Sequence, residues 1–85
     1  MDISRDEQRV LHALAQGGRI VAIKDDKGHV AAIQCFNRDG WLMNHASLVI
    51  FGKLRRKKAI RSRNGGPYQI TRRGLELVRS ELDNR

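Results

Sequence analysis

Apolar residues near the start of the chain recur at the spacing of an amphipathic helix. The residues on this stripe are Val10, Leu11 and Leu14. Ahead of them, Ser4 and Glu7 have the spacing of a capping box, in which each side chain accepts a hydrogen bond from the other residue's backbone amide. Two consecutive glycines then favour the end of the helix. The pattern therefore predicts a helix over residues 5–16.

The next apolar pattern is that of β-strands. Residues 19–24 and 30–36 are rich in β-branched and apolar side chains, and the charged and glycine residues of 25–29 separate them as a turn. These segments predict a β-hairpin, followed by a further turn at 38–40. Residues 41–43 then form either a short strand or the entry to the next helix, and the pattern leaves both open.

The middle of the chain favours a second helix, which begins at Asn44 or His45 and ends near Lys57. Its inward stripe, at the spacing i, i+3, i+4 and i+7, is Ser47, Ile50, Phe51 and Leu54. Residues 48–51 also have strand propensity, and Gly52 weakens a helix. We prefer the helix because of its length and because the basic residues near its end are favourable at a helix C-terminus.

A second hairpin and a closing helix are predicted in the last third of the chain. Residues 59–63 and 68–71 are short strand-like runs on either side of an Asn-Gly-Gly-Pro cluster, which supplies the positive φ angles of a turn. Thr71 then offers its hydroxyl as a helix N-cap. The apolar stripe of the closing helix is Leu75, Val78 and Leu82. Hairpin and closing helix are therefore continuous.

Together these elements predict the order α-β-β-α-β-β-α in one small α+β domain that spans residues 1–85. A chain of 85 residues suffices for one hydrophobic core and not for two. The second half is similar to the wing and final helix of winged-helix DNA-binding domains, so we expect a winged-helix-like fold. The hairpin of residues 19–36 stands where a winged helix-turn-helix carries its second helix, so the helix pair that docks in a DNA groove would be incomplete.

The composition indicates a globular protein outside the membrane. Apolar residues make up 40% of the chain and charged residues 31%. No apolar run approaches the roughly 20 residues that span a bilayer, and the start of the chain lacks the pattern of a signal peptide. The single cysteine, Cys35, has no partner for an internal disulfide, which fits a reducing compartment. We therefore expect a cytoplasmic protein without membrane contact.

Positive charge is concentrated in one segment. Residues 53–73 contain nine Lys or Arg and no Asp or Glu, whereas the rest of the chain holds eight basic and nine acidic residues. The nine are Lys53, Arg55, Arg56, Lys57, Lys58, Arg61, Arg63, Arg72 and Arg73. We expect them to bind phosphates or an acidic protein surface, because concentrated positive charge attracts polyanions. The alternative is a solvated face that only keeps the protein in solution, but such faces normally interleave both signs.

No other side chains indicate catalysis or metal binding. His12, His29 and His45 form no i, i+4 pair, so we expect no zinc site. The chain has no nucleophile elbow and no carboxylate pair in an apolar context, so we expect neither an enzyme nor a cofactor. Cys35 is expected to be a small buried apolar residue. Trp41 is expected to pack in the core or on a hairpin, with a partner-facing anchor as the alternative.

Taken whole, the sequence is similar to the YjhX-like toxin family of small bacterial proteins. The motifs of this resemblance cover nearly the entire chain and are Ser4-Arg5-x-Glu7-Gln8-Arg9, Leu11-His12-x-Leu14-Ala15, Gly17-Gly18-Arg19-Ile20, Cys35, Arg38-x-Gly40, Phe51, Leu54, Lys57-Lys58, Asn64-Gly65, Pro67-Tyr68, Gly74-Leu75, Val78-Arg79 and Leu82-Asp83-Asn84-Arg85. The resemblance implies a toxin of a toxin-antitoxin pair that binds and inhibits DNA topoisomerase I. It also implies an acetyltransferase-like antitoxin that neutralises the toxin, and it supplies no catalytic residues.

The charge pattern and the resemblance lead to one hypothesis about the contact surface. Residues 53–73 would either engage the topoisomerase where DNA would lie or hold DNA itself. The alternative function is a winged-helix-type DNA-binding module or transcription regulator without topoisomerase activity.

Overall fold

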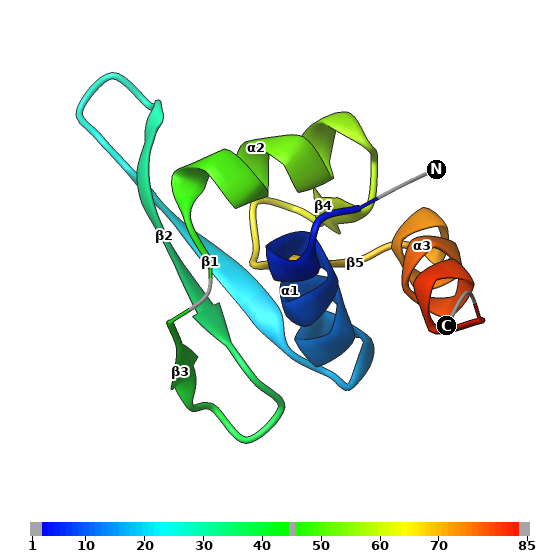
Figure 1. Ribbon diagram of the computed structural model, residues 1–85. Coiled ribbons are helices and arrows are strands. Elements are labelled where there is room, and N and C mark those ends of the chain that lie inside the picture. The colour runs from blue at the N-terminus through cyan, green and yellow to red at the C-terminus, as the bar shows by residue number, and fades with distance from the viewer. Residues whose placement is uncertain (1–2, 45, 84–85) are drawn as a thin grey trace.

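The computed structural model describes residues 3–44 and 46–83, which form one small α+β domain (Figure 1). Its elements are α1 (Arg5–Ala15), β1 (Arg19–Lys24), β2 (Val30–Phe36), β3 (Leu42–Met43), α2 (Leu48–Arg56), β4 (Ile60–Ser62), β5 (Tyr68–Ile70) and α3 (Arg72–Asp83). The predicted order of elements is confirmed with one addition. The strand alternative for residues 41–43 is correct, because β3 pairs with β2.

The two predicted hairpins belong to a single sheet. The strand order is β3-β2-β1-β5-β4, and every neighbouring pair is antiparallel. β1 joins the hairpins, because Ile20 pairs with Tyr68 on one side and with Cys35 on the other. β3 and β4 are therefore opposite edges of the sheet.

The three helices and one face of the sheet enclose the core. Ile20 and Cys35 point into it and are 0% and 1% exposed, whereas Val21 and Gln34, the next residues along each strand, are more accessible. The prediction of a buried Cys35 is confirmed, and burial raises the pKa of its thiol. The core also contains Val10, Leu11, Leu14, Ile50, Phe51, Leu54, Ala59, Ile60, Leu77 and Val78. The α1 stripe is therefore as predicted.

The placement of Trp41 in the core is wrong. Trp41 is 72% exposed and lies immediately before β3. The strand pairs only with β2 at the edge of the sheet, so nothing on its outer side covers the ring within the described residues.

α2 is shorter than predicted. It begins at Leu48 instead of residue 44 or 45, and His45 lies outside the described residues. Ser47 is not on the inward stripe but is the N-cap, since its hydroxyl accepts a hydrogen bond from the Ile50 amide at 3.2 Å. Ile50 and the two apolar residues after it on the stripe are buried as predicted.

α3 begins as predicted but turns a different face to the core. The Thr71 hydroxyl accepts from the Gly74 amide at 3.1 Å, which confirms the N-cap. Val78 is buried as predicted, but Leu75 is 38% exposed, and Gly74 and Leu77 are buried instead among the α3 side chains that the structure describes, residues 72–79. The inward face of α3 is therefore rotated away from Leu75 toward Gly74 and Leu77, and the Leu82 side chain lies outside the described part of the chain.

The reason for the rotation is the close approach of α3 to the turn before β4. A Cβ atom on Gly74 would lie 2.4 Å from the backbone oxygen of Ala59, so only glycine fits at this contact. The contact fixes which side of α3 faces inward and brings its first turn against the end of α2.

The winged-helix expectation is not confirmed. Among residues 3–44 and 46–83, the segment between α1 and α2 contains three strands and no helix. Its β-rich pattern pairs into the sheet, so the described residues hold no helix-turn-helix pair. None of the described helices is both long and apolar enough to cross a membrane.

Candidate partner-binding surface

The end of α2 is a tight turn that carries the chain directly into β4. Lys58 donates its backbone amide to the Arg55 oxygen at 2.9 Å, and Ala59 donates to the Leu54 oxygen at 2.9 Å. These two bonds are those of a Schellman motif, and Lys58 occupies its left-handed position with φ 58°. The Lys58 oxygen in turn accepts from the Thr71 hydroxyl at 2.7 Å. The turn is thus bound to the start of α3.

Two adjoining hollows lie around this turn and the β4–β5 hairpin. The first, of about 570 Å³, is lined by Arg55, Lys58, Ile60, Arg61, Ser62, Tyr68 and Thr71. The second, of about 480 Å³, is lined by Arg61, Arg63, Gln69, Ile70, Thr71, Arg72 and Arg73. Arg61 and Thr71 belong to both, so we treat the two hollows as one surface, called the basic groove. Among the side chains that the structure describes, no acidic one lines either hollow.

The alternation of β4 turns Arg61 toward solvent. Ile60 is buried, so the next residue, Arg61, points to the opposite face of the sheet and is exposed. Arg61 pairs across the strands with Gln69, whose side chain lies on the same face. Arg63, two residues beyond Arg61, is also exposed and lines the second hollow.

Arg55 is held against aromatic rings at the other end of the basic groove. Its guanidinium carbon lies 5.7 Å from the centre of the Phe51 ring and 5.8 Å from that of Tyr68. The two rings meet edge to face, with centroids 4.9 Å apart and an interplanar angle of 86°. This contact fixes α2 to β5 and restricts the Arg55 side chain to the groove.

Arg72 and Arg73 occupy the first turn of α3, which has no acidic residue. The positive end of the helix dipole adds to their charge. Arg73 makes an ion pair with Glu76 at 3.7 Å, but both side chains are about half exposed, so solvent screens the pair. A positive charge at this helix end is unfavourable for the helix, so Arg72 and Arg73 do not stabilise α3 through its dipole.

Lys57 is set apart from the other predicted contact residues. Its ammonium lies 2.6 Å from the carboxylate of Glu7, which is buried at 2% exposure. Burial alone would raise the pKa of Glu7, but hydrogen bonds from Lys57 and Ser4, together with the Lys57 charge, bring that pKa below its ordinary value. Lys57 therefore has a structural partner within the fold.

Lys53 and Arg56 lie outside the two hollows. Both are exposed in the last turn of α2, where a positive charge is favourable at the C-terminus of a helix. Six of the nine predicted residues are thus brought together in the basic groove, and three are not. The six are Arg55, Lys58, Arg61, Arg63, Arg72 and Arg73.

The whole sequence, residues 1–85, matches the YjhX toxin family, which is described as "putative toxin of bacterial toxin-antitoxin pair". The chain belongs to this family. It is 64% identical to a UPF0386 protein of Sinorhizobium fredii, 61% identical to one of Chelativorans sp. and 59% identical to one of Rhizobium etli, and each alignment covers 100% of both chains. No solved structure matches the chain. Membership in the family implies a cognate antitoxin as a partner.

The charge pattern of this YjhX-family protein did not indicate the neutral residues of the groove. Tyr68, Gln69 and Thr71 line it beside the arginines. Gln69 stands opposite Arg61 in the β4–β5 register, so pairing the two predicted strands would have placed it there. Within the described residues, no group of three or more His, Cys, Asp or Glu is arranged to hold a metal ion.

Proposed function

We propose that this protein is a toxin that inhibits DNA topoisomerase I and that it acts through the basic groove, in the cytoplasm. The resemblance of its motifs to the YjhX-like toxins suggests the enzyme as target. The observation that supports the groove as the acting surface is that six cationic side chains, from α2, β4, α3 and the turns between them, line two adjoining hollows with no acidic residue among the described side chains. Such a surface attracts acidic side chains or DNA phosphates.

Two modes of inhibition follow from this chemistry. In the first, the groove binds an acidic surface on the topoisomerase and keeps DNA from its place. In the second, the groove holds the phosphates of DNA and denies the enzyme its substrate. We favour direct contact with the enzyme. The cognate antitoxin would be an acetyltransferase-like protein, as the resemblance implies, and it would relieve the inhibition.

The test is the relaxation of negatively supercoiled plasmid by DNA topoisomerase I at increasing amounts of the protein, at two DNA concentrations. Inhibition that depends on the ratio of protein to enzyme supports direct binding. Inhibition that depends on the ratio of protein to DNA supports occupation of the substrate. No inhibition at either DNA concentration rejects the topoisomerase as target.

A charge-matched pair of variants tests the groove itself. The groove variant replaces Arg61, Arg63 and Arg72 by Gln. The control variant replaces three other basic residues by Gln, namely Lys24, Lys53 and Arg56. These three are exposed and line neither groove hollow. Both variants lose three positive charges. We expect inhibition to weaken by roughly tenfold or more in the groove variant and far less in the control. Equal effects would mean that net charge acts and not the groove.

The second candidate is a DNA-binding module without topoisomerase activity. The observation that favours it is that the β4–β5 hairpin follows α2 directly, as a wing would, and β1 pairs with β5 to join it to the main sheet. If the groove neutralises about six phosphates, duplex affinity should fall with salt at a log-log slope of roughly −5. The groove variant should reduce that slope by about 3. A duplex affinity without salt dependence would remove this candidate.

A further inference from the structure

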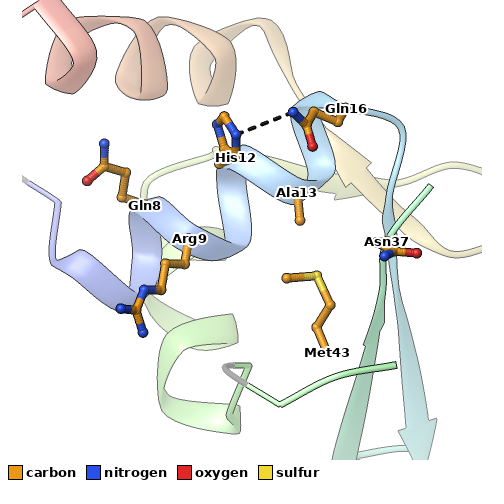
Figure 2. Close-up of a pocket in the computed structure, with 7 residues that line it drawn as sticks. All are labelled: Gln8, Arg9, His12, Ala13, Gln16, Asn37 and Met43. Carbon is orange, nitrogen blue, oxygen red and sulfur yellow. Dashed lines mark hydrogen bonds between the residues drawn. The ribbon is translucent and has the colours of Figure 1, made fainter. Parts of the chain in front are cut away.

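A second surface lies at the other edge of the sheet from the basic groove. A hollow of about 450 Å³ opens between α1 and the β2–β3 end of the sheet (Figure 2). Its lining residues are Gln8, Arg9, His12, Ala13, Gln16, Asn37 and Met43. We call it the α1–β3 hollow. β3 is the outermost strand on this side, whereas β4 forms the opposite edge beside the basic groove.

The chemistry of the α1–β3 hollow fits an aromatic side chain with a polar edge. Ala13 and Met43 give it an apolar part, and in Figure 2 the Met43 side chain extends from β3 toward α1. His12 and Gln16, joined at 3.3 Å, stand on the α1 side and offer hydrogen-bonding groups. Arg9 can contribute a cation against a ring face. The volume falls in the range of roughly 300–1,000 Å³ that holds small ligands, so an indole ring has room.

Trp41 stands beside this hollow without filling it. The β2–β3 register pairs Cys35 with Met43, and the Asn37 amide bonds to the Trp41 oxygen at 2.9 Å, so Trp41 lies opposite Asn37. Residues directly opposite in an antiparallel pair have their side chains on the same face of the sheet. Trp41 is therefore on the face of the hollow, yet it is 72% exposed and does not line it.

The stretch that begins at Gly40, beside Trp41, carries no charged side chain, although the turn before it holds Arg38 and Asp39. Residues 40–52 contain no Lys, Arg, Asp or Glu, in a chain of which 31% is charged. The exposed large apolar residues of this stretch are Trp41, Leu42, Leu48 and Val49. Two copies of a chain with net charge +8 repel each other over most of their surface. The edge around Trp41 carries few charges, Arg38 and Asp39 in the β2–β3 turn and Arg9 in the hollow, so two copies meet there with less repulsion than across their basic grooves.

We infer that the protein forms a symmetric dimer in which Trp41 of each copy inserts into the α1–β3 hollow of the other. A two-fold interface needs a self-complementary patch, and a protruding ring beside a matching hollow provides one. The outer edge of β3, which pairs with no other strand among the described residues, lies in the same patch. Both basic grooves then remain at the far ends of the dimer. This inference does not depend on the proposed function.

The wild-type protein gives the first test. In analytical ultracentrifugation the mass should rise with protein concentration from 9.7 kDa toward twice that value. Trp41 is the only tryptophan, so its fluorescence should shift to shorter wavelength over the same range of concentration. Added salt should strengthen the dimer by screening the repulsion between copies, whereas binding to phosphates or acidic groups weakens in salt. A protein that stays monomeric throughout overturns the inference.

Two variants and their mixture test the reciprocal insertion. Trp41→Ala removes the ring and should weaken the dimer by roughly 30-fold, the effect of an interface hot spot. The control Ile23→Ala removes an apolar side chain that is 42% exposed on β1 and should leave association unchanged. His12→Trp fills the hollow from α1 and should weaken the dimer as well. Circular dichroism should be that of the wild type in all three.

The mixture of the two weakened variants is decisive. A Trp41→Ala copy has an open hollow, and a His12→Trp copy keeps its Trp41. Their heterodimer therefore retains one of the two insertions, while each homodimer retains none. Mixing should restore association above that of either variant alone. Failure to restore it, a dimer insensitive to Trp41→Ala, or a monomer whose Trp41 instead binds the antitoxin would each overturn the inference.

Discussion

The ammonium of Lys57 lies 2.6 Å from the carboxylate of Glu7 and joins the end of α2 to the start of α1. Glu7 also accepts the Ser4 amide at 3.1 Å, and its own amide donates to the Ser4 hydroxyl at 3.1 Å. The Glu7 side chain is 3% exposed and that of Lys57 is 24% exposed. A carboxylate so deeply buried requires a cationic partner. The first role of Lys57 is therefore to stabilise the fold, and not to bind a partner molecule.

We expect Lys57→Met to destabilise the protein by about 2–3 kcal/mol, because it leaves the Glu7 charge buried without its cation. This loss is smaller than the roughly 3–5 kcal/mol of a fully buried pair because the Lys57 side chain is 24% exposed. The double variant Glu7→Gln/Lys57→Met should recover most of that loss. Urea denaturation measures both, with Lys53→Met, an exposed lysine of the same helix, as the control. A double variant no more stable than Lys57→Met would contradict this account.

The same pair gives the stability a specific pH dependence. Burial opposes the charged form of Glu7, but Lys57 and Ser4 lower its pKa below the ordinary value in the folded state. The stability from the pair is therefore present above the ordinary carboxyl pKa of about 4.3 and is lost as the pH falls through the lower pKa of the folded protein. Glu7→Gln should be less stable at neutral pH but should lose less stability on acidification.

The measurement is thermal unfolding of the wild type and Glu7→Gln from neutral to acidic pH. Asp26→Asn, which removes a carboxylate from the exposed β1–β2 turn, is the control and should follow the wild type. If the wild type and Glu7→Gln lose stability in parallel, Glu7 is not the group that confers the acid sensitivity.

Local patterns predicted most of the fold, whereas contacts between distant segments were not visible in the sequence. The α1 capping box and stripe depend on residues within one helix and were correct. The sheet register that places Ile20 beside Tyr68 joins segments far apart in the chain. Glu7, the partner of Lys57, lies 50 residues away in the sequence. The count of basic residues in 53–73 does not reveal this ion pair, so it placed Lys57 in the contact surface. The rotation of α3 likewise depends on its contact with Ala59, a residue outside the helix, so the apolar periodicity within α3 could not predict it.

Gly74 should be a position where even alanine is not tolerated. An added Cβ would meet the Ala59 backbone oxygen at 2.4 Å, and backbone cannot move aside as a flexible side chain can. We expect Gly74→Ala to destabilise by about 2–3 kcal/mol. Gly52→Ala is the matched control, since its Cβ would meet only the end of the Arg56 side chain at 3.4 Å. That change should stabilise α2 by up to about 1 kcal/mol.

Chemical denaturation of both glycine variants checks this prediction. Gly74→Ala should also weaken inhibition, because α3 carries Arg72 and Arg73 into the basic groove and must shift to admit the methyl group. A Gly74→Ala protein as stable as the wild type would show that α3 does not press on Ala59 in solution.

Substitution of Lys58 should change stability and binding in opposite directions. It holds the left-handed position of the α2 Schellman turn at φ 58°, where glycine is preferred and a side chain costs roughly 1 kcal/mol. The same side chain lines the first hollow of the basic groove. Backbone strain at a charged residue is expected where that charge serves binding. Lys58→Gly should therefore stabilise the protein by about 1 kcal/mol and, if the proposed function holds, weaken the inhibition of the topoisomerase at the same time.

The matched variant is Lys58→Ala, which loses the same charge but keeps the strained conformation. Inhibition should weaken equally in both variants, while only Lys58→Gly should unfold at higher denaturant concentration. Equal stability of the two variants would mean that the turn is not strained at Lys58. Unchanged inhibition in both would remove Lys58 from the contact surface and move that surface toward Arg61, Arg63 and Arg72 in the second hollow.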